Sequence, residues 1–177
     1  MENNNLIKVG VLGAESTGKT SLCELLAKHY QTVYVPEYAR IYFNHSDINT
    51  CTIKDLEIIA SKQIELEKSI IKQANGILFF DTSLITIKIW AELEFRQSSS
   101  IINELLKQEQ FDYYLICNND LAWEKDAQRQ NKFSRDLIFE MNLKEAEKSG
   151  IPYNIVSGVG EIRLKKSLMI LNSRFSL

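Results

Sequence analysis

The chain has 177 residues, with 21 basic and 23 acidic side chains and a formal net charge of −2. This length is enough for a substantial core, so we expect a single domain over residues 1–177. No basic tract favours nucleic acid as a partner, and the apolar run after the first residues is too short for a signal peptide or a membrane span. We therefore expect a cytoplasmic protein with neither nucleic acid nor a membrane as a partner. The sequence does not indicate its oligomeric state.

Strand-like apolar runs alternate with helical stretches along the chain, after a polar tail over residues 1–5. The predicted strands are 7–12, 32–36, 77–81, 111–117 and 151–156. The predicted helices are 17–30, 52–75, 83–95, 100–108, 134–149 and 161–174. The polar stretch 118–132 has no apolar period and is predicted to be a lid-like loop or a short helix. This order predicts an α/β fold, in which helices cover both faces of a five-stranded parallel sheet.

The most specific motif lies between the first predicted strand and the first predicted helix. Residues 13–20 read GAESTGKT and match the P-loop pattern G-x-x-x-x-G-K-[ST]. Its glycines let the backbone approach a ligand closely, and amides at the start of the helix point into one concavity. Lys19 adds a cation for the outer phosphates of ATP, and the Thr20 hydroxyl can ligate Mg²⁺. The residues predicted to bind the ATP phosphates are Gly13, Glu15, Ser16, Thr17, Gly18, Lys19, Thr20 and Ser21. A glycine-rich turn that binds nothing is the alternative interpretation.

Two carboxylates follow predicted strands at the sheet edge where parallel α/β folds bind ligands. Asp81 ends the strand 77–81 and is a candidate to hold Mg²⁺ with Thr20; the alternative is a cap on the following helix. Glu37 follows the strand 32–36 and is a candidate general base for an attacking hydroxyl; the alternative is a loop glutamate paired with Arg40. The residues themselves leave open which carboxylate takes the proton.

The acceptor of the phosphoryl group is predicted from aromatic and basic residues near the same edge. Tyr38 is a candidate to stack on an acceptor ring or else packs beside its strand. Arg40 is a candidate to hold the acceptor or to orient Glu37, and the alternative is an arginine on the surface of a helix. Trp123 can stack on a flat, cationic ring, and Arg129 can act as an arginine finger on the transferring phosphate, with Arg135 as a second candidate. The alternative for the whole stretch is a solvated helix with one half-buried tryptophan.

Together these residues resemble the kinase domain of NadR-type ribosylnicotinamide kinases. The motifs that carry the resemblance follow the same order along the chain: the P-loop, Glu37-Tyr38-x-Arg40, Phe80-Asp81-Thr82, Asn118-Asn119 and Trp123-x-x-Asp126-x-x-Arg129. The resemblance implies a P-loop kinase that uses ATP and Mg²⁺ to phosphorylate the 5′-hydroxyl of nicotinamide riboside. Lys19, Glu37, Asp81 and Arg129 are then the catalytic candidates, and Asp126 is a carboxylate that would favour the cationic acceptor.

Two other functions remain open at this point. One is a kinase for another nucleoside or a nucleotide, and the other is a P-loop ATPase or regulatory nucleotide-binding module. NadR proteins often carry an adenylyltransferase domain with an H-x-G-H motif. This chain has only two histidines, His29 and His45, so we expect a kinase-only member.

Overall fold

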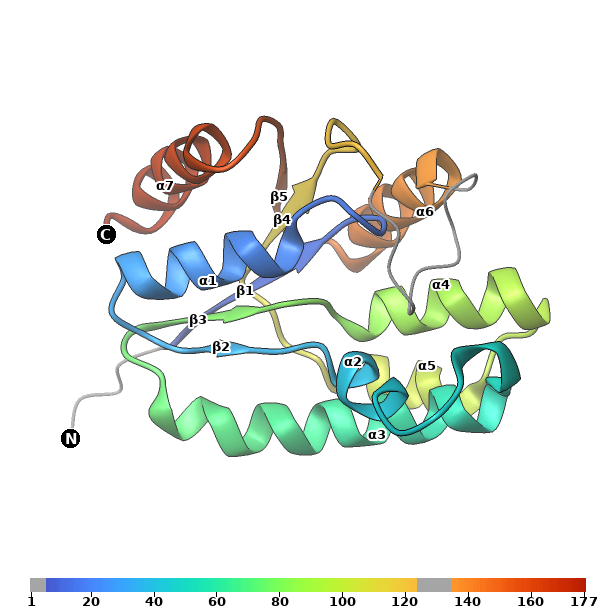
Figure 1. Ribbon diagram of the computed structural model, residues 1–177. Helices are drawn as coiled ribbons and strands as arrows, with labels where there is room; N and C mark the ends of the chain where they lie inside the picture. The colour runs from blue at the N-terminus through green and yellow to red at the C-terminus, as the bar shows by residue number, and fades with distance from the viewer. Residues whose placement is uncertain (1–5, 124–134) are drawn as a thin grey trace.

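The computed structural model describes residues 6–123 and 135–177, which form an α/β fold around one parallel sheet (Figure 1). The five strands lie in the order β2-β3-β1-β4-β5, and every neighbouring pair is parallel. Their bounds are β1 Ile7–Leu12, β2 Tyr34–Val35, β3 Ile77–Phe80, β4 Tyr113–Cys117 and β5 Tyr153–Val156. The predicted fold class is confirmed.

Seven α-helices within the described residues surround this sheet. They are α1 Lys19–His29, α2 Tyr38–Phe43, α3 Ile53–Ile70, α4 Leu84–Phe95, α5 Ser100–Leu106, α6 Arg135–Ser149 and α7 Glu161–Phe175. Two short 3₁₀ helices, Ile48–Thr50 and Ile71–Gln73, flank α3. None of the helices in the part of the chain that the structure describes is both long and apolar enough to cross a bilayer.

The two faces of β1 pack against different helices because side chains alternate along a strand. Val9 and Val11 pack with α1 and α7 on one face, and Leu12 packs with α4 and α6 on the other. Gly10 belongs to this second face, where a Cβ would lie 2.8 Å from the Tyr114 ring. The sheet is therefore covered on both sides, and ligands reach it at the ends of its strands.

A separate apolar cluster joins α2, α3, α4 and α5 beside the sheet. Leu56, Ile59 and Ala60 of α3 are fully buried in it. The helix α3 begins with a capping box, in which Thr52 accepts from the amide of Asp55 and the Asp55 side chain accepts from the amide of Thr52. This rigid helix supports α2, which follows β2 directly.

The structure differs from the prediction mainly between β2 and α3. The predicted strand 32–36 is paired only over Tyr34–Val35, and residues 38–43 form the helix α2, which the sequence analysis did not predict. The helix is six residues long, and only Ala39 and Phe43, four residues apart, are buried in it. Such a short pattern does not distinguish a helix from a loop.

Candidate active site

The P-loop takes the strained backbone path that its sequence predicts. Gly13 has a φ of 138° and Gly18 a φ of 76°, both in the region that favours glycine. A Cβ on Gly13 would lie 2.8 Å from the carbonyl oxygen of Cys117, so β4 also requires glycine there. Lys19 is the first residue of α1, and its Nζ donates to the carbonyls of Gly13 and Ala14 at 2.9 Å each. The loop and the N-terminus of α1 thus form a cationic concavity.

Two arginines from distant segments tie the P-loop to the C-terminal half of the chain. Nη2 of Arg135, at the start of α6, lies 3.5 Å from the carbonyl oxygen of Ser16. Arg163 of α7 is 3% exposed and donates to the carbonyl of Thr17 and to the carboxylate of Asp120. The carbonyl side of the loop is therefore held by cations, and its amides are left to face the pocket.

Asp81 directly follows β3 and meets the P-loop threonine. The Thr20 hydroxyl donates to Asp81 Oδ2 at 2.6 Å. The other oxygen, Oδ1, is buried and accepts no hydrogen bond from the described residues. Burial raises the pKa of this carboxyl, whereas Lys19 and the Thr20 hydrogen bond oppose the rise. A hard divalent cation prefers oxygen ligands, so Thr20 and Asp81 Oδ1 fit a Mg²⁺ ion.

Glu37 is the second carboxylate beside the loop. It occupies the N-cap position of α2, yet its side chain makes no capping hydrogen bond. Its Oε2 lies 3.7 Å from Nε of Arg40, and the side chain is 23% exposed. Burial raises its pKa, Lys19 opposes the rise, and the nearby Asp81 adds to it. Glu37 thus lies close enough to Lys19 and Asp81 for both charges to affect its pKa.

A cavity of about 160 Å³ adjoins the P-loop, and the apolar part of this cavity forms a chamber. Residues 13–21 line one end, and Glu37 and Arg40 also line the wall. The other lining residues among those described are apolar or uncharged: Ala39, Phe43, Ile48, Thr86, Ile89, Trp90, Leu93 and Ile138. The rings of Phe43 and Trp90 contact each other, with centroids 5.6 Å apart. A phosphate cradle therefore opens into a chamber with flat, apolar walls, and a carboxylate belongs to the same wall.

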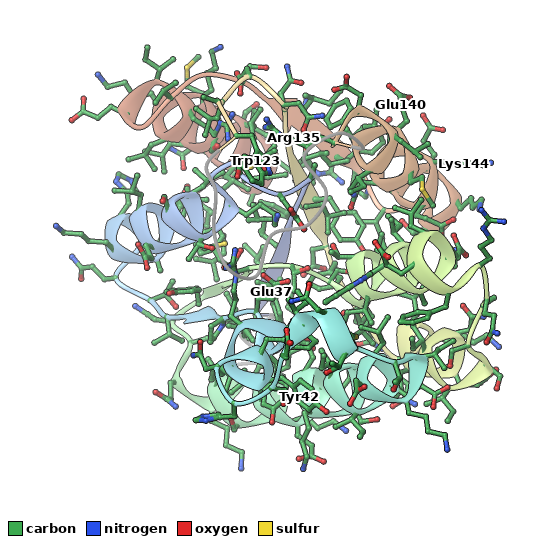
Figure 2. The ribbon with its side chains drawn as sticks, turned by 45° about the vertical axis from the view of Figure 1, so that its right-hand side comes forward. Glu37, Tyr42, Trp123, Arg135, Glu140 and Lys144 are labelled. Carbon is green, nitrogen blue, oxygen red and sulfur yellow. The ribbon has the colours of Figure 1, made fainter. Side chains whose placement is uncertain are left out.

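Two aromatic residues that were predicted to bind the acceptor are not part of the described cavity lining. Tyr38 packs against the apolar cluster of α2 to α5 and is not among the described residues that line the cavity. Trp123 is drawn beside Arg135 in Figure 2, apart from Glu37, and is likewise absent from that lining. Asp126, Arg129 and most of the expected lid 118–132 lie outside the described residues.

Sequence reasoning missed the chamber itself. Trp90 lies in α4, whose residues are apolar nearly all round, so no pattern in the sequence distinguishes a pocket wall from a core position. Phe43 lies in the short helix that was not predicted. The one available signal was position, because α4 begins directly after Asp81 and its turns must pass the carboxyl edge of the sheet.

Comparisons with known proteins agree with this geometry. A family model described as "AAA domain" matches residues 8–163, which is most of the chain. The trifunctional NAD biosynthesis/regulator protein NadR of Salmonella typhimurium strain LT2 is 29% identical over 146 residues. That match covers 77% of this chain and 35% of the relative, so the chain spans about a third of the relative's length.

Solved structures of NadR share the fold. A NadR protein in complex with NR superposes with a TM-score of 0.85 at 21% identity, covering 97% of this chain and 52% of that one. A NadR complex with NAD and AMP-PNP gives a TM-score of 0.82 at the same identity, covering 97% and 50%. These matches confirm the resemblance to NadR that the sequence motifs indicated. The chain therefore belongs to the AAA domain family, with a P-loop kinase fold like that of NadR.

Proposed function

We propose that this chain is an ATP-dependent kinase that phosphorylates the 5′-hydroxyl of nicotinamide riboside to give nicotinamide mononucleotide. The observation that carries the proposal is the cavity in which the P-loop, Glu37 and an aromatic chamber meet. Phosphoryl transfer to a nucleoside needs a site for the phosphoryl donor, a group that takes the proton of the hydroxyl, and space for the flat ring of the nucleoside. This cavity brings the three together. Relatives named for NAD biosynthesis, and a NadR structure with NR, support the choice of acceptor.

The donor end of the cavity would bind ATP and Mg²⁺. The P-loop amides and Lys19 hold the phosphates, and Thr20 and Asp81 hold the metal ion. When bound, the ion neutralises charge that develops on the phosphate oxygens. Because Asp81 has one oxygen bonded to Thr20 and the other suited to the metal, it is a poor candidate for the base.

Glu37 therefore takes the proton of the attacking hydroxyl. The hydroxyl oxygen forms a bond to the γ-phosphorus, the bond from that phosphorus to the β,γ-bridging oxygen breaks, and ADP leaves. Burial raises the pKa of Glu37, which makes it a stronger base than an exposed glutamate. Lys19 opposes this rise, because a nearby positive charge favours the ionised carboxylate.

The aromatic chamber suits a flat and positively charged ring. Trp90 is partly buried and Phe43 is buried, and both line the cavity that Glu37 also lines. A cation over an aromatic face gains about 0.5–2 kcal/mol, with the larger values where water is excluded. Nicotinamide riboside carries this charge on its ring, whereas nucleosides with the common bases are neutral. Asp126 and Arg129 keep the roles predicted for them, beside the acceptor ring and on the transferring phosphate.

The proposal is tested by ADP release from purified protein with and without an added acceptor. We expect release that depends on both nicotinamide riboside and Mg²⁺. Lys19→Ala should abolish it while the protein remains folded by circular dichroism, because the lysine acts by charge from a partly exposed position. ADP release at the same rate with and without each acceptor would indicate an ATPase or a regulatory module. Wild-type turnover in Lys19→Ala would refute the P-loop mechanism itself.

A further inference from the structure

A glutamine of α3 holds the backbone on both sides of Glu37. Gln63 is 1% exposed, on the face of α3 that supports α2. Its Oε1 accepts from the amide of Tyr38 at 2.7 Å, and its Nε2 donates to the carbonyl of Pro36 at 3.3 Å. One side chain thus bonds the residue before Glu37 and the residue after it.

These two bonds fix the conformation of Glu37 itself. The Pro36 carbonyl belongs to the peptide plane before the Glu37 Cα, and the Tyr38 amide belongs to the plane after it. Peptide planes are rigid, so holding both of them leaves φ and ψ of Glu37 little freedom. The direction of its Cα–Cβ bond toward the cavity is then set by α3, and only side-chain torsions remain.

One of these bonds also gives an acceptor to the first amide of α2, that of Tyr38. The first amides of a helix need acceptors, and the N-cap side chain usually supplies one. Glu37 is the N-cap of α2 but makes no such bond, while Gln63 accepts from the first amide of the helix. The Glu37 carboxylate makes no capping hydrogen bond and belongs to the cavity wall.

A glutamine is the suitable residue at this place. Its amide offers a donor and an acceptor together, and Pro36 and Tyr38 require one of each. Gln63 also makes a hydrogen bond that lowers the otherwise raised pKa of Glu67, one turn further along α3. A carboxylate at position 63 would lack the donor for Pro36 and would add a negative charge beside Glu67.

We propose that Gln63 is a positioning residue of the kinase reaction, which acts by holding Glu37 in the orientation that accepts the proton. This inference rests on the function proposed above, because it requires Glu37 to be the base. Small displacements of a catalytic group can cost about 10²-fold in rate. Substrate binding depends on other residues. We therefore expect a change at Gln63 to lower kcat and to leave the KM for ATP unchanged.

The test compares Gln63→Leu with a matched control, Tyr42→Phe. Tyr42 lies at the far end of α2 from Glu37, and its hydroxyl donates to Asp55 at the start of α3 (Figure 2). Both substitutions thus remove hydrogen bonding between α2 and α3, but only Gln63→Leu releases the peptides around Glu37. We expect Gln63→Leu to lower kcat about 10- to 100-fold with the KM for ATP nearly unchanged, and Tyr42→Phe to stay within about threefold of wild type.

Two further measurements separate positioning from loss of stability. In a Glu37→Gln background, Gln63→Leu should lower kcat no further, because the group that it positions is already inactive. Amide hydrogen exchange at Tyr38 should become faster in Gln63→Leu and not in Tyr42→Phe. If Gln63→Leu does not fold, Gln63→Glu keeps the shape and the acceptor for Tyr38 but loses the donor for Pro36, and we expect a smaller loss of kcat.

The possible failures are distinguishable. Losses that multiply in the double variant, an unchanged exchange rate at Tyr38, or an equal loss in Tyr42→Phe would each overturn the positioning role. If Glu37→Gln is impaired but neither Gln63 variant is, only the inference about Gln63 falls. If Glu37→Gln keeps full kcat, the base assignment in the proposed function is wrong, and the positioning role falls with it.

Discussion

At the scale of single residues, the site depends on one cation near two carboxylates, of which Asp81 is buried and Glu37 is partly exposed. Lys19 lowers the pKa of both Asp81 and Glu37, while burial raises both, and Asp81 adds to the rise at Glu37. The three side chains come from α1, from the end of β3 and from the start of α2. Their different partners separate their roles: Asp81 bonds Thr20, whereas Glu37 stays on the cavity wall.

The role of Glu37 predicts a specific kinetic defect. Glu37→Gln keeps the size of the side chain but cannot take a proton, so we expect kcat to fall about 10²- to 10⁴-fold. The KM for ATP should change little, because the P-loop binds the nucleotide. Glu65→Gln is the control, since Glu65 is an exposed residue of the neighbouring α3. Retained kcat with a higher acceptor KM would make Glu37 a binding residue.

The role of Asp81 predicts a change in metal dependence. Asp81→Asn preserves the shape of the side chain but removes the charge that holds Mg²⁺, so activity should fall strongly and require more Mg²⁺. Steady-state rates measured over a Mg²⁺ titration test this. Asp112→Asn is a suitable control, because Asp112 only accepts from the amide of Lys8 at the opposite edge of the sheet. Identical titration curves for Asp81→Asn and wild type would mean that Asp81 does not hold the metal ion.

At the scale of the elements, the sequence predicted the sheet well and the acceptor chamber poorly. β1 and the start of α3 after Thr52 were placed correctly, because each has a strong local signal in periodicity or in polar spacing. The chamber depends on the packing of α2 against α4, which brings Phe43 and Trp90 together across 47 residues of sequence. No local pattern encodes such a contact, so tertiary structure was needed to find it.

This packing makes Trp90 a test of the chamber. Trp90→Ala should raise the KM for the acceptor about tenfold, because it removes both apolar area and the ring that attracts a cation. Trp90→Phe should recover much of that loss, since it keeps an aromatic face against Phe43. Equal acceptor KM values for both variants and wild type would place the acceptor elsewhere. The KM for ATP, measured in parallel, reports whether the P-loop end is disturbed.

At the scale of the whole molecule, two partly buried carboxyls, Glu67 and Glu109, make stability depend on pH. Glu109 accepts hydrogen bonds from the Ser83 hydroxyl and the amide of Leu84, and so caps α4 just after Asp81. Burial raises the pKa of Glu109 to about 8, with a contribution from Glu67, whose own pKa burial raises to about 7. The folded protein therefore retains protons on these groups that the unfolded chain releases near its ordinary pKa of 4.5.

The sign of the resulting pH dependence follows directly. Between about pH 5 and about pH 8 the folded state binds more protons, so the free energy of unfolding should fall as pH rises. Each group contributes at most about 1.4 kcal/mol per pH unit. Glu109→Gln should flatten this fall in urea unfolding, and Glu104→Gln should not, because Glu104 is an exposed partner of Lys107. Equal pH slopes for wild type and Glu109→Gln would contradict the raised pKa of Glu109.

The central claim concerns the acceptor, and one measurement tests it most directly. The values of kcat/KM for nicotinamide riboside, uridine, cytidine and thymidine should be determined with the same protein and ATP. Cation–π attraction of up to about 2 kcal/mol supports a preference of about tenfold or more for the cationic nucleoside. We predict that ratio, with nicotinamide mononucleotide identified as the product by mass. Equal values for the neutral nucleosides would contradict the account and make this chain a general nucleoside kinase.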